Sequence, residues 1–130
     1  MGSARVLVLA ALVIVSVPIA NRPADAAGFD CKRAKSLVEK QICGVPVFSK
    51  QDGEIASLYT RTLAVLSKDD VTALREEQRA WVKQREECED MIHGDPVIMA
   101  DVLACIRQLM GERKERLQAI FDRKQYFKQD

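Results

Sequence analysis

Apolar residues recur at helical spacing through most of this chain, and no segment alternates convincingly between apolar and polar positions. Between residues 50 and 66 the inward positions follow the i, i+3, i+4, i+7 pattern of one buried helix face. These positions are Ile55, Leu58, Tyr59, Thr62, Leu63 and Leu66. The pattern predicts a helix that begins after Ser49 and ends near Leu66.

A further helix is expected to begin after Ser67, because Asp69 and Asp70 would then lie in the first turn, where the helix dipole favours carboxylates. It is expected to run to about Met91. Residues that recur alternately three and four positions apart lie on one face of this helix, which we call its seam. They are Val71, Leu74, Gln78, Trp81, Arg85 and Cys88.

The last helix is expected to begin at Asp95, with Pro96 at the first helical position, where proline is favoured. It is expected to run to about Phe121 or further, and residues 122–130 are expected to form a frayed tail. Its seam contains the polar residue Arg113 among apolar positions.

A much shorter helix precedes these three. Ser36 and Glu39 form the sequence signature of a capping box, and Gly44 and Pro46 are typical of a helix end. The predicted helix, residues 37–43, has about two turns and is too short to be stable alone in water. The sequence therefore predicts an all-α fold: a short capped first helix followed by three longer helices.

Gln78, Arg85 and Arg113 are polar residues on otherwise apolar seams. Burying such groups without hydrogen-bond partners is costly, so each is expected to meet one. We expect Gln78 to bind the backbone of a neighbouring loop and Arg85 to pair with a carboxylate or with carbonyl groups near the first helix. In the functional alternative, Arg85 lines a binding cleft.

The N-terminal region has the features of a secretory leader. Residues 6–20 are uncharged and mostly apolar, Arg5 precedes them, and Ala24-Asp25-Ala26 resembles a cleavage site. The apolar run is shorter than the roughly 20 residues of a spanning helix. We therefore predict a signal peptide over residues 1–26, which is removed, and a single exported domain over residues 27–130, with no stable membrane anchor after cleavage.

Composition narrows the function. The whole chain has 20 Lys+Arg and 19 Asp+Glu, and residues 27–130 are electrically neutral, since the leader contains Arg5, Arg22 and Asp25. This balance argues against nucleic acid as the main partner. The 4 cysteines of an exported chain indicate two disulfides, for which three pairings are possible. Their wide spacing, with a single histidine, is unlike a zinc site, so neither a metal nor a cofactor is expected.

Catalytic motifs are absent from the sequence. It contains no Gly-x-Ser-x-Gly elbow, no His-Glu-x-x-His pair, no glycine-rich phosphate loop and no Cys-x-x-Cys redox motif. We therefore expect that the protein is not an enzyme and has no catalytic residues.

Several motifs, taken in order, resemble the LprI-type lysozyme-inhibitor domain of secreted bacterial proteins. They are Phe29-Asp30-Cys31, Ser36-x-Val38-Glu39-x-x-Ile42-Cys43, Asp52-x-x-Ile55-x-x-x-Tyr59, Gln78-Arg79-x-Trp81-x-x-x-Arg85-x-x-Cys88, and Cys105 followed by Arg113. The resemblance implies a small, exported helical domain with disulfides, in a family named for inhibition of lysozyme. Together with the spacing, it implies the pairs Cys31–Cys43 and Cys88–Cys105.

An inhibitor of a basic lysozyme would benefit from an acidic surface. Residues 86–104 contain six acids and no lysine or arginine, and the expected Cys88–Cys105 bridge would close them into a loop. The predicted partner-binding residues are Glu86, Glu87, Glu89, Asp90, His93 and Asp95. The alternative reading is a solvated helix end with no partner.

A second hypothesis uses the basic residues of the last helix and tail, which are Arg107, Arg113, Lys114, Arg116, Arg123, Lys124 and Lys128. In this hypothesis the domain is a cell-envelope interaction module that binds an anionic polymer, a membrane surface or another exported protein. The sequence selects no lysozyme class and no oligomeric state. It also does not choose among periplasm, cell wall and release from the cell.

Overall fold

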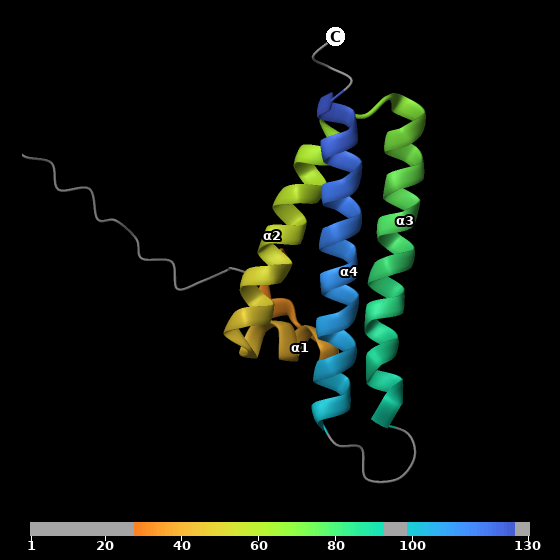
Figure 1. Ribbon diagram of the computed structural model, residues 1–130. Coiled ribbons are helices and arrows are strands. Elements are labelled where there is room, and N and C mark those ends of the chain that lie inside the picture. Colours follow the sequence, from red (N-terminus) through yellow and green to blue (C-terminus); the bar gives the residue numbers. More distant parts are fainter. Residues whose placement is uncertain (1–27, 93–98, 127–130) are drawn as a thin grey trace, which may run out of the picture.

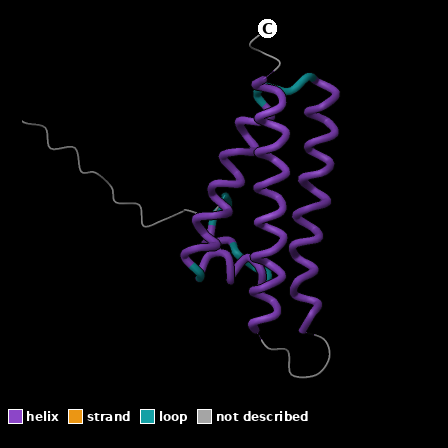
Figure 2. Tube along the Cα trace, viewed as in Figure 1, coloured by secondary structure: helices purple, strands orange, loops and turns teal. Residues whose placement is uncertain are grey.

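The computed structural model describes residues 28–92 and 99–126, and every regular element within these ranges is helical, as predicted (Figure 2). Three long helices lie side by side, with α4 in the middle and α2 and α3 on its two sides (Figure 1). The short helix α1 packs near one end of this layer. The elements are η1 (Cys31–Arg33), α1 (Leu37–Gly44), α2 (Pro46–Leu63), α3 (Lys68–Glu86), η2 (Glu87–Ile92) and α4 (Met99–Tyr126).

The predicted capping box begins α1. The Ser36 hydroxyl accepts a hydrogen bond from the Glu39 amide at 3.0 Å, and the Glu39 carboxylate accepts from the Ser36 amide at 3.2 Å. The same carboxylate also accepts from the Lys35 amide, and this bond is the main reason that the pKa of Glu39 is lowered. Glu89 of η2 accepts from the Leu37 amide at 3.1 Å. Several of the amides that a helix start leaves unpaired are therefore satisfied.

The predicted start of the second helix after Ser49 is wrong. The helix α2 begins at Pro46, and Val45 is both the residue that ends α1 and the N-cap of α2. The Val45 carbonyl accepts from the amides of Phe48 and Ser49 at 2.9 and 3.0 Å. Proline favours this first position because its φ is already helical and it has no N–H to leave unpaired. Pro46 therefore starts a new helix as well as marking the end of α1.

The other boundaries differ at the C-terminal ends. The helix α3 begins after Ser67 as predicted but ends at Glu86, and a 3₁₀ helix, η2, replaces the predicted extension to Met91. The helix α4 continues past Phe121 to Tyr126, so the first part of the predicted frayed tail is helical. The predicted start of this helix, at Asp95 and Pro96, lies outside the described residues.

One apolar core joins all four α-helices. The residues of the predicted face of α2 are buried or half-buried, and the middle of α4 contributes side chains with no exposed surface. Burying a large aliphatic or aromatic side chain contributes roughly 1.5–3 kcal/mol, so this core is the main source of stability. Its members are Val38, Ile42, Phe48, Ile55, Leu58, Leu74, Trp81, Cys88, Val102, Ile106, Met110 and Leu117.

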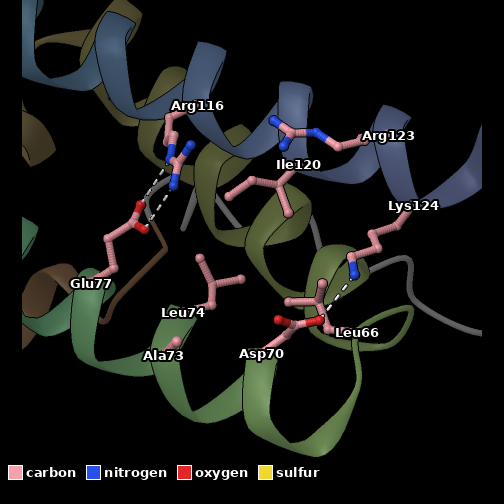
Figure 3. Close-up of a pocket in the computed structure, with 9 residues that line it drawn as sticks. All are labelled: Leu66, Asp70, Ala73, Leu74, Glu77, Arg116, Ile120, Arg123 and Lys124. Atoms are coloured by element: carbon pink, nitrogen blue, oxygen red, sulfur yellow. Dashed lines mark hydrogen bonds and ion pairs between the residues drawn. The ribbon is translucent and has the colours of Figure 1, made fainter.

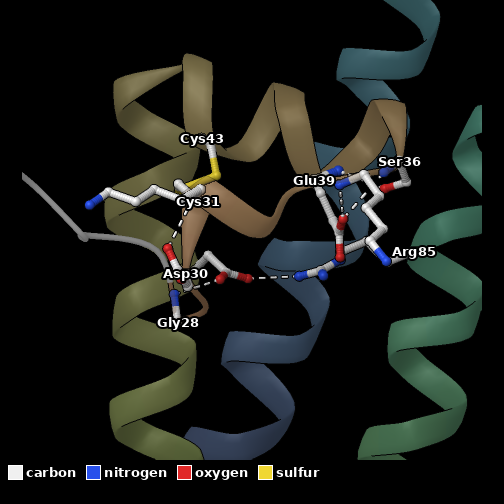
Figure 4. The surroundings of a disulfide bond; sticks show 10 residues. Gly28, Asp30, Cys31, Ser36, Glu39, Cys43 and Arg85 are labelled. Atoms are coloured by element: carbon white, nitrogen blue, oxygen red, sulfur yellow. Dashed lines mark hydrogen bonds and ion pairs between the residues drawn. A yellow bond between two sulfur atoms is a disulfide. The ribbon is translucent and has the colours of Figure 1, made fainter.

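Two disulfides connect the short helical elements to their neighbours. Cys31 in η1 is bonded to Cys43 at the end of α1 (Figure 4), and Cys88 in η2 is bonded to Cys105 in α4. This is the pairing that the spacing and the family resemblance imply. The first bridge joins η1 to the end of α1, a helix of only 8 residues, and the second fixes η2 to the first half of α4.

Replacing Cys31 and Cys43 together with alanine is expected to lower the free energy of unfolding by roughly 3 kcal/mol, the value for closing a loop of this length in the chain-entropy model. Urea denaturation of oxidised residues 27–130, followed by circular dichroism, measures this loss. A loss below about 1 kcal/mol would show that the core residues of α1, and not the bridge, hold this helix in place.

Candidate functional site

The buried ion pair between Arg85 and Asp52 joins α3 to α2. The Arg85 guanidinium donates to the Asp52 carboxylate at 2.7 Å, and the two side chains are only 6% and 7% exposed. The other Asp52 oxygen accepts from the Gly28 amide at 2.8 Å, so the same carboxylate also fixes the N-terminal segment (Figure 4). The guanidinium stacks 4.9 Å from the Trp81 ring. These residues also line a hollow of about 240 Å³. The contacts of Arg85 join α3 to α2, as the structural role predicts.

The polar residues Gln78 and Arg113 meet each other across the interface between α3 and α4. The Arg113 Nε donates to the Gln78 side-chain oxygen at 2.8 Å, and the guanidinium also pairs with Glu77. The expected contact of Gln78 with loop backbone is therefore wrong, because its partner is a side chain of α4. Trp81 donates its indole N–H to the Leu109 carbonyl at 3.1 Å. These bonds satisfy polar groups that face the core.

The predicted acidic surface is placed at the end of the bundle where η2 meets α4, and its members have different surroundings. Glu86 lies 3.5 Å from the Arg85 guanidinium, and Glu89 is bonded to the start of α1. Glu87 and Asp90 are exposed, and within the described ranges neither forms an ion pair. His93 and Asp95 lie outside the described residues.

A surface groove runs beside the Cys88–Cys105 bridge and has a volume of about 510 Å³. Glu87 and Asp101 contribute carboxylates from η2 and α4, and Ala104 and Leu109 contribute apolar surface. The complete lining is Gln84, Glu87, Cys88, Asp101, Ala104, Cys105, Gln108 and Leu109. We refer to this groove, together with the exposed carboxylate of Asp90, as the acidic groove.

Besides the disulfide and the apolar lining, the predicted partner-binding set omitted the polar side chains Gln84, Asp101 and Gln108 of the acidic groove. A spacing signal was present in the sequence. Gln84 precedes Cys88 by four residues, Asp101 precedes Cys105 by four, and Gln108 follows Cys105 by three. Residues three or four apart share a helix face, so a bridge between two helices brings these neighbours together.

The basic residues of α4 are mostly neutralised by the neighbouring helices. Arg113 and Arg116 pair with Glu77, Lys114 pairs with Glu54 at 2.5 Å, and Lys124 pairs with Asp70 at 2.9 Å. Among the described basic residues of the envelope-module hypothesis, Arg107 and Arg123 are the two that form no ion pair, so much less free positive charge is available than the sequence suggested.

The carboxylates of these pairs remain ionised at neutral pH. The hydrogen bond from Lys114 lowers the pKa of Glu54, and the hydrogen bond from Lys124 lowers the pKa of Asp70. Burial raises the pKa of Glu77, but the hydrogen bonds from Arg116 and Arg113 outweigh it, and the net shift is downward. The pairs on α4 are therefore charged on both sides under physiological conditions.

Two further findings concern the described residues alone. Over residues 28–92 and 99–126, no cluster of three His, Cys, Asp or Glu side chains is arranged to hold a metal ion. Within the same ranges, each helix is too short or too polar to cross a membrane.

The fold and the groove together define a small all-α domain in which one disulfide joins the two short N-terminal helical segments and a second fixes η2 to the layer of three long helices. The chain belongs to the LprI family: the family model described as lysozyme inhibitor LprI matches residues 31–117. The matched range contains all four cysteines, the buried Asp52–Arg85 pair and the acidic groove. Neither a search of curated proteins nor a search of solved structures found a match.

Proposed function

We propose that this chain is an exported, non-enzymatic protein that inhibits a lysozyme by protein–protein contact through the acidic groove. The predicted leader over residues 1–26 supports export, and membership of the LprI family supports inhibition of a lysozyme. The observation that carries the choice of surface is the pair of exposed carboxylates Glu87 and Asp101, which line the groove beside the Cys88–Cys105 bridge, with the exposed Asp90 on the same short helix as Cys88.

The charge distribution supports this choice. The cations of α4 are largely paired within the molecule, whereas the carboxylates of Glu87, Asp90 and Asp101 form no ion pairs within the described ranges. Complementary charge accelerates the encounter with a basic partner and disfavours other partners. The acidic groove is thus the surface best suited to a basic lysozyme.

The second disulfide supports the proposal in a different way. Cys88 is only 1% exposed, and its bridge to Cys105 fixes η2 against α4 before any partner arrives. A surface that is already ordered loses less conformational entropy on docking. The groove also offers Gln84 and Gln108, whose side chains can donate to and accept from a partner's backbone.

The proposal is tested by titrating oxidised residues 27–130 into a basic lysozyme acting on bacterial cell walls, with lysis followed by turbidity at low and moderate salt. We expect saturable, stoichiometric loss of lysis that persists at moderate salt. If no class of lysozyme is inhibited, the proposal is wrong, and binding to an anionic envelope polymer becomes the next function to measure.

A further inference from the structure

A second groove lies at the opposite end of the bundle, between the first half of α3 and the last part of α4 (Figure 3). It has a volume of about 290 Å³. Its apolar floor is formed by Leu66, Ala73, Leu74 and Ile120, and its charged rim is formed by Asp70, Glu77, Arg116, Arg123 and Lys124. Arg123 is 18 residues from Cys105 in sequence, or roughly 27 Å along α4, so this groove is separate from the acidic groove.

Ion pairs cross this groove at both ends. Arg116 donates to Glu77 through two nitrogens, each at 3.3 Å, and Lys124 donates to Asp70 at 2.9 Å. In Figure 3 the side chains of Leu74 and Ile120 lie between the two pairs. The lowered pKa values of Asp70 and Glu77 keep both carboxylates charged. Each carboxylate therefore already has its counter-charge.

Arg123 makes the rim electrically unbalanced. Its side chain is exposed at the edge of the groove, and within the described ranges no carboxylate lies at ion-pair distance from it. Three cations and two carboxylates line the groove, and Glu77 also pairs with the buried Arg113, so the rim carries at least one uncompensated positive charge next to an apolar floor. A guanidinium binds a carboxylate through two parallel hydrogen bonds, which makes it a strong and directional partner for that group.

We propose that this groove binds an aliphatic monocarboxylate, with the carboxylate on Arg123 and the alkyl chain on Leu74 and Ile120. The exposed guanidinium of Arg123, which forms no ion pair within the described ranges, matches one anionic group. The floor is apolar, so an alkyl chain that lies on it desolvates no polar group there. A cationic ligand fits poorly, because Asp70 and Glu77 are already paired. The proposal is independent of lysozyme inhibition, since Arg123 and Lys124 lie beyond the residues matched by the family.

The volume sets the length of the ligand. A cavity of about 150 Å³ in another protein accepts benzene, and this groove is close to twice that size. A chain of about eight carbons, such as octanoate, is therefore the appropriate probe. Because the groove is open to solvent at its rim, the affinity should be modest, with a dissociation constant of about 0.1–1 mM.

The test is a titration of ¹⁵N-labelled residues 27–130 with octanoate, followed by amide chemical shifts, with octanol and octylamine as probes of the same length. We expect octanoate to shift the amide signals of residues 66–77 and 116–124 until binding is saturated. The uncharged octanol and the cationic octylamine should bind at least tenfold more weakly. Shifts that octanol reproduces at equal affinity would overturn the role of Arg123.

Two arginine variants complete the test. Arg123→Gln is expected to weaken octanoate binding about tenfold, and because the residue is exposed the variant should fold normally. Arg107→Gln, an exposed arginine on the same helix outside the groove, is the matched control and should bind as the native protein does. The proposed ligand would be contradicted if both variants weakened octanoate binding equally. It would also be contradicted if the groove bound a short peptide with a free C-terminus but did not bind octanoate.

Discussion

Asp52→Ala is expected to lower the free energy of unfolding by about 3–5 kcal/mol. The substitution would leave the Arg85 guanidinium, whose side chain is 6% exposed, with only the longer contact to Glu86 at 3.5 Å, and would remove the acceptor for the Gly28 amide. Removing one member of a buried ion pair costs much more than the net value of the pair, because an uncompensated charge remains in the core. The loss would be a large part of the 5–15 kcal/mol that is typical of small domains.

Two further variants separate this effect from a general loss of charge. Lys50→Ala, at an ion pair in which the lysine side chain is 77% exposed, should change stability by less than about 0.5 kcal/mol. The double variant Asp52→Ala with Arg85→Met should lose less than the sum of the two single variants, because no charge is left buried. Urea denaturation measures the native domain, the two single variants, the double variant and Lys50→Ala. A loss below about 1 kcal/mol for Asp52→Ala would show that the pair contributes little to the fold.

Reversing the charge of Glu87, Asp90 and Asp101 together to lysine is expected to weaken lysozyme inhibition about a hundredfold, because complementary charge changes encounter rates by 10–10³. None of the three carboxylates is ion-paired within the described ranges, so the fold should be retained. Glu87 is the C-cap of α3, where a lysine is favourable to the helix dipole. Circular dichroism checks that the variant is folded.

The matched control reverses three exposed acids elsewhere, Glu76, Glu115 and Asp122, and so produces the same net charge. At moderate salt the screening length is about 8 Å, so distant charges matter less than those in the acidic groove. The control should then keep most of its inhibition. Equal loss in both triple variants would mean that overall charge, and not the acidic groove, governs the interaction.

Local features of this fold could be predicted from local sequence. The capping box at Ser36 and Glu39 is formed by residues three apart, and the buried face of α2 follows from its periodicity. The start of α2 was predicted wrongly because Pro46 is compatible both with the end of one helix and with the first position of the next. The packing of Phe48, which is 2% exposed, is visible only in the fold. The sequence alone did not distinguish the two positions of Pro46.

The polar partners could not be predicted, because they depend on how distant segments pack. Arg85 and Asp52 are 33 residues apart, and Glu89 and Leu37 are 52 apart. The seam showed that Arg85 needed a partner but not which carboxylate would provide it. The basic cluster on the last helix was likewise visible in the sequence, whereas its neutralisation by α2 and α3 appears only in the fold.

The most direct test of the proposed function is to map the surface of the domain that contacts a basic lysozyme. We would add unlabelled lysozyme to ¹⁵N-labelled, oxidised residues 27–130 and follow the intensity and position of each amide signal. We expect changes concentrated in residues 84–92 and 99–108, which surround the acidic groove. The proposed binding surface would be contradicted if the changes were confined to residues 66–77 and 116–124. It would also be contradicted if no amide signal changed at concentrations that inhibit lysis.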